Sequence, residues 1–294
     1  MINAISPEEV QAFLAKYHLT QREASQITGL GEKNISRWMT GRSRPLESVS
    51  NFLRLLLADE AAFKDTGRKS NSISGGLWVW LGEQAAAEVH TAPFGRDKLR
   101  KAVKDLRELT QHPLESVAPQ VKEILCQAGV ALVFVPAMKE TALRGCTRLL
   151  TPSRAMIIHS LKYRNLSQFW IILFHEIAHL LLHIEAPGDT FTDYEEQSTD
   201  PREVDADTWA YDALVSLDDE LEFKAKSPVP APWQVEQFAR RIRVHPAIVA
   251  EVFNKRAGNE VISYSLMRMK GFFPTVDASV ASKLMALSRV VAAG

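Results

Sequence analysis

Two histidines four residues apart, with a glutamate after the first, are the residues of this chain best suited to chemistry. The run His175-Glu176-Ile-Ala-His179 matches the pattern HExxH. Residues i and i+4 share one face of a helix, so both imidazoles can bind one metal ion, and zinc is the usual ion for such ligands. Glu176 stands one residue aside and can take a proton from water and deliver it to a leaving amine. The pattern therefore predicts a zinc site with Glu176 as its catalytic base.

The surroundings of this short match decide how much weight it carries. HExxH arises by chance in about one chain in a hundred of this length, and two histidines on a buried helix can also be ordinary core residues. Here the match lies inside an apolar segment, Leu166 to Ile184, behind the helix-opening pair Asn165 and Gln168. The segment has membrane length, but the three histidines and one glutamate within it predict a buried helix rather than a span.

A hydrolytic zinc site needs a third protein ligand and one open position. His183 continues the i+4 series, but each step of four residues drifts by about 40° around a helix, so three successive turns suit one ion poorly. In the alternative HExxHxxGxxH pattern, Leu182 stands where the glycine belongs. Glu203 is the preferred ligand, and Asp207, four residues later, can accept the ring N–H of a ligand histidine. Glu203 can also simply complete a capping box with Asp200, and this alternative stays open.

Apolar patterning and helix-start signals predict the elements that hold these residues. Val130–Val135 and Ala155–Ser160 have the length and β-branching of buried strands, and Arg144–Leu149 is interpreted as an edge strand. In the N-terminal part, helices are expected from a capping box at Ser6–Glu9, over residues 20–29 and 32–39, and from about residue 46. Further helices are expected over residues 97–109, 114–128, 165–184 and 200–215, with two more after residue 232 that are split near His245. The predicted fold class is α+β: an all-α N-terminal domain at residues 1–65, a linker at 66–95 that starts Gly/Ser-rich, and a mixed α+β domain at 96–294.

The segment Phe169–Val215 resembles the ImmA/IrrE family of zinc metallopeptidases. That family pairs HExxH with Glu-x-x-Ala-(Asn/Asp)-x-(Phe/Trp)-Ala, which here reads Glu203-Val-Asp-Ala-Asp207-Thr-Trp-Ala. The resemblance extends over most of residues 97–273 through three further runs: Gly145–Arg148, Ser160–Arg164 and His245–Val249. It departs from the family at Ala178, where glycine is usual, and at Asp207, where asparagine is common.

This resemblance implies a zincin-like fold, a small mixed sheet packed on helices, with Zn²⁺ as the cofactor. It also implies cleavage of one particular protein, often a repressor, rather than general digestion. The group that stabilises the tetrahedral oxyanion stays open among His159, Tyr163 and His245.

The N-terminal residues carry a second signal, the spacing of a helix-turn-helix. Leu19-Thr-Gln-Arg-Glu-Ala-Ser25 resembles the opening of the first helix of the pair in the Cro/repressor (XRE) family, and Ile35 and Trp38 are expected to face inward. The resemblance implies that Gln21 meets a phosphate, that Arg42 and Arg44 lie along the DNA backbone, and that the major groove is faced by Glu32, Lys33, Asn34, Ser36 and Arg37. Repressors of this kind usually dimerise on operator half-sites, so a homodimer is expected.

Composition excludes few functions. The chain of 294 residues has no net charge, but residues 1–57 carry seven basic and five acidic side chains, a net of +2, whereas residues 185–222 carry fourteen acidic side chains and one Arg, a net of −13. The two cysteines, Cys126 and Cys146, show no metal or disulfide spacing, and the N-terminus does not have the pattern of a signal peptide, so a cytoplasmic protein without a membrane partner is expected.

The combined expectation is a DNA-binding zinc endopeptidase that cleaves a specific regulatory protein, such as a repressor, and so controls transcription. The alternative is a transcriptional regulator or antitoxin-like repressor whose peptidase fold acts as a sensor or dimerisation module. An intact HExxH favours the first, because a purely structural metal site does not need Glu176. The fused N-terminal domain favours the second.

Overall fold

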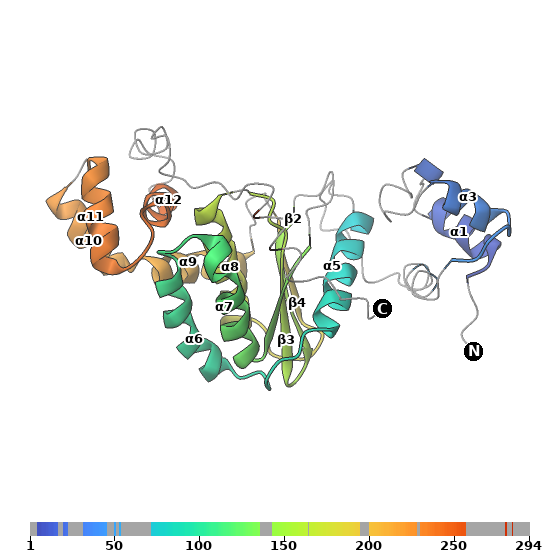
Figure 1. Ribbon diagram of the computed structural model, residues 1–294, viewed down its shortest axis with the longest axis horizontal. Coiled ribbons are helices and arrows are strands. Elements are labelled where there is room, and N and C mark those ends of the chain that lie inside the picture. The colour runs from blue at the N-terminus through green and yellow to red at the C-terminus, as the bar shows by residue number, and fades with distance from the viewer. Residues whose placement is uncertain are drawn as a thin grey trace. The chain divides into compact units, whose positions relative to one another are not determined.

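In the computed structural model, a four-stranded mixed sheet lies at the centre of the second of two compact units (Figure 1). The structure describes residues 5–16, 20–22, 32–45, 50, 53, 72–135, 143–163, 165–194, 200–227, 230–256, 280 and 284. Helices surround the sheet, so the fold is α+β as expected. The chain divides into two units, and the boundary within its first hundred residues falls between Trp80 and Leu81.

The strands run in the order β1-β3-β2-β4. Strands β1 (Val130–Phe134) and β3 (Arg154–His159) are parallel, whereas β2 (Leu143–Thr151) pairs antiparallel with both β3 and β4 (Thr190–Tyr194). Every residue of β1 is buried, as its apolar sequence predicts for a strand covered on both faces. The expected edge strand at 144–149 is instead an interior strand, because β4, which the sequence analysis did not predict, adds to its other side.

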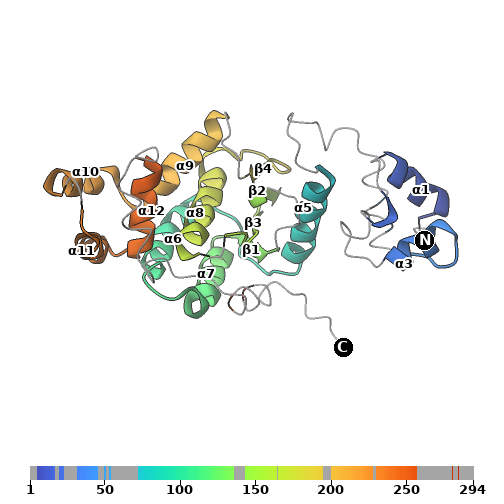
Figure 2. The same cartoon turned by 90° about the horizontal axis from the view of Figure 1, so that it is seen from above.

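Helix α8 (Leu166–Leu182) carries both motif histidines and is the most deeply buried helix. Its start follows the sequence signal, since the Asn165 side chain accepts a hydrogen bond from the backbone N–H of Gln168 at 2.7 Å. Helices α6 (Arg96–Leu109) and α7 (Leu114–Gln127) lie on the same side of the sheet as α8 (Figure 2). Their apolar faces join α8 and the sheet in one core, which fixes α8 against the strands.

A helix occupies much of the range expected to be a linker. Helix α5 spans Ser72–Ala87, within the predicted linker at 66–95. Its C-terminal half packs on the sheet, where Gly82 approaches Ile158 so closely that a Cβ would lie 2.1 Å from the Ile158 side chain. Glu83 forms an ion pair with Arg148 of β2. The linker prediction rested on the Ser/Gly-rich composition at the start of this range. The apolar residues that follow form a helix because tertiary packing stabilises it.

Between β4 and Arg256 the described residues form four helices, and all but the second begin where the sequence analysis predicts. They are α9 (Pro201–Leu214), α10 (Leu217–Lys226), α11 (Pro232–Ile242) and α12 (Pro246–Arg256). Helix α9 lies against α8. The split near His245 is confirmed, and α10 is an additional helix that the sequence analysis did not identify.

In the N-terminal unit, two helices are described and both begin where expected. Ser6 and Glu9 form a capping box at the start of α1 (Pro7–Lys16), with N–H to side-chain oxygen distances of 2.7 and 3.2 Å. Helix α3 (Glu32–Met39) buries Ile35 and Trp38, the two predicted inward anchors. Most of the expected helix at 20–29 lies outside the described residues, and so does the start of the expected helix from residue 46.

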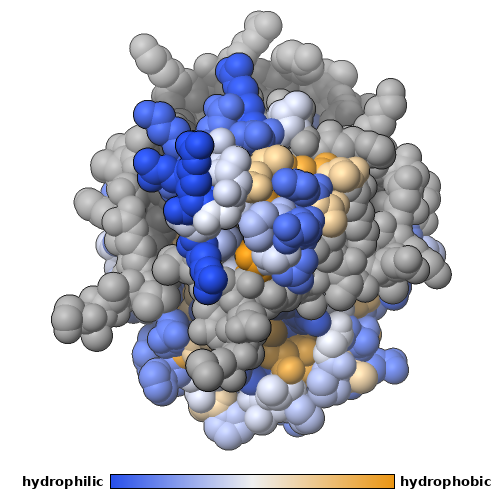
Figure 3. Space-filling model, turned by 90° about the vertical axis from the view of Figure 1, so that its right-hand side faces the viewer, coloured by the Kyte–Doolittle hydropathy of each residue, from blue (hydrophilic) through white to orange (hydrophobic). Residues whose placement is uncertain are grey.

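None of the helices in the described ranges is long and apolar enough to cross a membrane. On the face drawn in Figure 3, the described side chains are mainly hydrophilic, and the apolar ones form small areas between them.

Candidate metal centre

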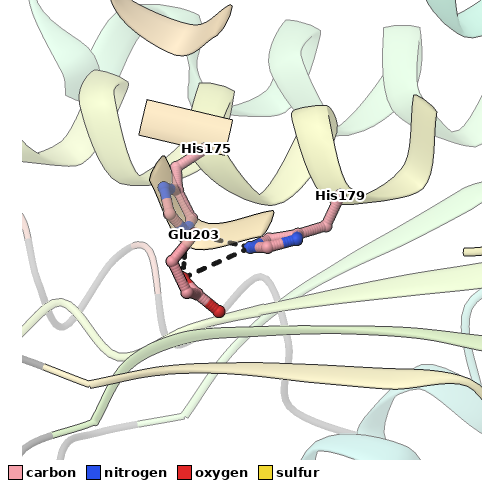
Figure 4. Close-up of side chains that lie close together, drawn as sticks. All are labelled: His175, His179 and Glu203. Atoms are coloured by element: carbon pink, nitrogen blue, oxygen red, sulfur yellow. Dashed lines mark hydrogen bonds and ion pairs between the residues drawn. The ribbon is translucent and has the colours of Figure 1, made fainter. Parts of the chain in front are cut away.

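Two helices bring three metal-ligand side chains to one point. His175 and His179 lie one turn apart on α8, and Glu203 comes from the first turn of α9 (Figure 4). The Nε2 atoms of the two histidines are 3.0 Å apart, and Glu203 Oε2 lies 3.1 Å from His175 Nε2 and 3.5 Å from His179 Nε2. The Glu203 oxygen that could have served a capping box is therefore turned toward the histidines.

The arrangement fits a small tetrahedral cation. His175 Nδ1 lies 2.8 Å from Asp207 Oδ1, so Nδ1 carries a hydrogen, and Nε2 presents a lone pair once its own proton is lost. Its neighbours at that point are another imidazole nitrogen and a carboxylate oxygen, so the three atoms form a set of acceptors. Ligands about 2.0–2.1 Å from a tetrahedral zinc ion are about 3.3 Å from one another. The three measured separations, 3.0, 3.1 and 3.5 Å, lie close to this value.

Each ligand histidine has a partner on its other ring nitrogen. For His175 the partner is Asp207, and for His179 it is His183, whose Nδ1 lies 3.0 Å from His179 Nδ1. Phe191 of β4 stacks on the His179 ring with centroids 4.4 Å apart. Such contacts orient a ligand ring and fix its tautomer. The structure thus places Asp207 where the sequence analysis expected it, and places His183 beside a ligand rather than among the three.

The electrostatics of the three residues indicate a site built around one positive charge. Burial lowers the pKa of His175, but hydrogen bonds to Asp207 and Glu203 outweigh it and leave that pKa well above its ordinary value. Burial raises the pKa of Glu203, yet its hydrogen bonds with both histidines bring it far below the usual range. Burial lowers the pKa of His179. A proton held between His175 and Glu203 therefore occupies the place that a cation would take.

Glu176 lies beside this centre, fully buried against β2. Its Oε2 accepts a hydrogen bond from the Thr147 hydroxyl at 2.5 Å, and its Oε1 has no partner among the described residues. Gly145 provides the space, because a Cβ there would lie 2.1 Å from Oε1. Burial raises the pKa of Glu176 to about 8, His175 opposes the rise and Asp193 adds to it. A carboxyl group with a raised pKa next to ligand histidines is suited to proton transfer near neutral pH.

The sequence analysis missed the residues that β2 and β4 contribute. Asp193 of β4 is 3% exposed and forms an ion pair with Arg144 of β2 at 2.5 Å. Burial lowers the pKa of Arg144, but Asp193, Asp207 and Tyr163 raise it on balance. Among these residues only Gly145 and Thr147 left a signal, as part of the run Gly145–Arg148 quoted for the resemblance. The five residues of β4, Thr-Phe-Thr-Asp-Tyr, are too short and too polar to stand out as a strand.

His159 is not available as the oxyanion-stabilising group. Its Nε2 donates to the Phe169 carbonyl at 3.3 Å, and its Nδ1 accepts from the backbone N–H of Leu161 at 3.0 Å. His245 uses its Nδ1 to accept from the backbone N–H of Ala247 at 3.1 Å. Tyr163 lies near enough to Arg144 to raise its pKa, as stated above. His159 also lies near the centre, as the cross-strand partner of Gly145, but both of its ring nitrogens are engaged, which leaves Tyr163 as the nearby candidate.

The residues expected to contact DNA fall on described parts of the N-terminal unit. Most are exposed: Glu32, Lys33, Asn34 and Arg37 on α3, and Arg42 and Arg44 after it. Ser36 and Gln21 are half-buried. The exposed side of α3 is therefore polar and opposite the buried Ile35 and Trp38, as a helix that lies in a groove requires.

Comparisons of the chain with protein-family models, with curated proteins and with solved structures find no match.

Proposed function

We propose that this protein is a zinc-dependent endopeptidase that cleaves a specific regulatory protein, such as a repressor, and binds operator DNA through its N-terminal unit. The observation that carries the peptidase part is the convergence of His175, His179 and Glu203 beside a buried Glu176. Three protein ligands leave one position of a tetrahedral ion open, which distinguishes a catalytic zinc site from a structural one. The resemblance to the ImmA/IrrE family adds to this reading.

The chain's own groups divide the work of peptide hydrolysis. When bound, zinc supplies Lewis acidity toward a carbonyl oxygen and toward water. Glu176 takes one proton from the attacking water as the new carbon–oxygen bond forms, and gives it to the amine nitrogen as the carbon–nitrogen bond breaks. Thr147 holds the Glu176 carboxyl in place through its hydroxyl. Asp207 and His183 keep the ligand rings oriented.

The sheet suggests how a protein substrate binds. Strand β4 pairs with β2 on one side, and no described strand pairs with its other side. Two side chains of β4 adjoin the centre, since Phe191 stacks on His179 and Asp193 lies near His175 and Glu176. An extended segment of a substrate can add to this edge through main-chain hydrogen bonds and so pass the centre. This supports a peptidase that acts within an exposed, extended segment.

The N-terminal unit supports the DNA-binding part of the proposal. The exposed polar face of α3 and the basic residues Arg42 and Arg44 match the roles implied by the XRE resemblance. In this reading the unit is a helix-turn-helix domain and the second unit a zincin-like peptidase domain. With a net charge of only +2 over residues 1–57, a single copy binds DNA weakly, so a homodimer is part of the proposal.

One observation favours the alternative function, a transcriptional regulator in which the metal centre acts as a sensor or dimerisation module. The centre is closed: Glu176 and His179 are 0% exposed and His175 is 2% exposed. A substrate carbonyl must displace some covering group to reach them, whereas a bound ion need not. The alternative therefore requires metal binding without cleavage.

Metal analysis combined with a search for cleaved proteins separates these readings. Zinc-loaded protein and its Glu176→Gln variant are incubated with lysate of the source cell, and new protein N-termini are identified by mass spectrometry. We expect one cleaved regulatory protein with the wild type and none with the variant, with about one zinc per chain in both. Zinc without cleavage supports the regulator, and absence of zinc refutes the metal centre itself.

A further inference from the structure

Asp193 is a buried carboxylate next to the metal centre that the three-ligand site does not use. It lies on β4 with 3% of its surface exposed. Its Oδ1 accepts a hydrogen bond from Arg144 Nη2 at 2.5 Å, whereas its Oδ2 has no partner within the described part of the chain. A buried, unpaired carboxylate oxygen in a native structure needs an explanation.

The unpaired oxygen of Asp193 has a counterpart in Glu176. Glu176 Oε1 is likewise buried and unpaired, and one ligand-type atom each of His175, Glu176 and Asp193 lie within 4.8 Å of one another. Gly145 is the cross-strand partner of Asp193, and its missing side chain makes the room that Glu176 Oε1 occupies. The two carboxylates therefore meet over Gly145, beside a ligand histidine.

The chemistry of Glu176 and Asp193 indicates which kind of ligand can satisfy their two unpaired oxygens. Each is only an acceptor when ionised, as both carboxylates are taken to be once a metal ion is bound, so neither can then satisfy the other without an added hydrogen. A second cation is disfavoured, because both ring nitrogens of His175 are already engaged, Nδ1 by Asp207 and Nε2 within the three-ligand set. A molecule that brings two hydrogens satisfies both acceptors. Water and a newly formed amine each do so.

We propose that Asp193, held by Arg144, is a second acceptor in the reaction site and positions the attacking water and the departing amine together with Glu176. This rests on the proposed peptidase function. The proton still moves from water to Glu176 and on to the amine nitrogen, while Asp193 accepts a hydrogen bond. Arg144 fixes the direction of that acceptor by occupying the other oxygen.

Acetohydroxamate tests this role without a known substrate, because it binds metal and brings one N–H and one O–H. Its affinity is measured by absorption titration of the cobalt-loaded full-length protein. Asp193→Asn keeps the oxygen that Arg144 holds but replaces the free acceptor with a donor. We expect it to weaken acetohydroxamate binding about 10- to 100-fold, the range for loss of a charge-assisted hydrogen bond. Thiocyanate, which brings no hydrogen, should bind as well as before or better.

Two further variants complete the test. Asp212→Asn removes the same charge from an exposed position of α9, and it should leave the affinity for both probes unchanged. Arg144→Lys keeps the charge beside Asp193 but not the planar fork, and it should weaken acetohydroxamate in the same direction as Asp193→Asn, though less.

The outcomes separate this inference from the proposed function. If Asp193→Asn and Arg144→Lys bind acetohydroxamate as the wild type does, or if both probes weaken equally, the role of Asp193 is refuted and the metal centre stands. If the wild type takes up no cobalt, the proposed function is refuted and the role of Asp193 with it.

Discussion

A single added methyl group on β2 should displace the Glu176 carboxylate. Gly145 lies under Glu176, and a Cβ at this position would be 2.1 Å from Oε1, 2.7 Å from Cδ and 3.0 Å from Cγ of Glu176. Ordinary van der Waals contacts of a Cβ begin at 3.4 Å. In Gly145→Ala the carboxylate must therefore move by about 1 Å, and the hydrogen bond from Thr147 breaks.

The size of the effect follows from three contributions. Overpacking a dense core costs about 1–3 kcal/mol. Loss of the Thr147 hydrogen bond costs about 0.5–1.5 kcal/mol. Replacing a strand glycine by alanine returns about 0.5–1 kcal/mol. The free energy of unfolding of metal-free protein at pH 7 should fall by about 0.5–4 kcal/mol. Any peptidase activity should fall by about a hundredfold, as a 1 Å misplacement implies.

Urea unfolding in a double-mutant cycle tests this reasoning. In a Glu176→Ala background the three clashing atoms are gone, so Gly145→Ala should change stability by less than about 1 kcal/mol. Gly95→Ala is the matched control, since a Cβ there meets only the Lys98 side chain at 3.6 Å. It should have a small effect in both backgrounds. Equal destabilisation by Gly145→Ala with and without Glu176 would refute the steric argument.

Four further expectations follow. Metal analysis after dialysis should show that most bound zinc is lost in each of three variants, His175→Ala, His179→Ala and Glu203→Ala. In contrast, His183→Ala should keep zinc, with an affinity about 10- to 100-fold weaker by chelator competition. Full zinc in Glu203→Ala would contradict the ligand assignment. Because the pKa of Glu176 is raised to about 8, the folded metal-free protein keeps a proton there that the unfolded chain releases above pH 4.5, so stability falls as pH rises from 4.5 to 8. Glu176→Gln should not lose stability over this pH range, and in urea unfolding it should be more stable than the wild type at pH 8. If the stability of both proteins changes with pH in the same way, this explanation is wrong. Burial lowers the pKa of His159 from 6.5 to about 4. The free energy of unfolding is therefore unaffected by this group above pH 6.5 and is lower by about 2 kcal/mol at pH 5. His159→Leu should show a flatter profile of stability against pH than the wild type, and an equally steep profile would contradict this. Replacing Lys33 or Arg37 should relax operator preference by about 1–3 kcal/mol per lost base contact. Replacing Arg42 or Arg44 should instead weaken binding to all DNA sequences and flatten the salt dependence of binding. Absence of salt-dependent DNA binding by the full-length protein at low ionic strength would refute the helix-turn-helix reading.

The sequence alone determined what depends on neighbours along one helix. His175 and His179 had to share a face of α8 once the helix was predicted, and Asn165 indicated where that helix begins. The buried anchors of α3, Ile35 and Trp38, followed from the same helical periodicity. These predictions were reliable because the spacing of residues within a helix is fixed by its 3.6-residue turn.

The sequence left Glu203 with two readings, ligand or cap, because both use the same position in the first turn of a helix. The choice depends on where α9 lies relative to α8, and that is a packing result. In the structure, Oε2 of Glu203 lies 3.1 Å from His175. The spatial arrangement thus favoured one of two roles that local patterning could not separate.

Only the tertiary structure revealed the strand pairing around Glu176. Strand β4 is short and polar, and it exists because β2 offers a free edge far from it in the sequence. The register of that pairing places Asp193 opposite Gly145, and it brings Arg144 within 2.5 Å of Asp193. Helix α5 is a comparable case, since its residue Gly82 packs against Ile158 of a strand distant in the sequence. Such pairings are set by burial and hydrogen bonding between distant segments, which leave no fixed spacing in the sequence.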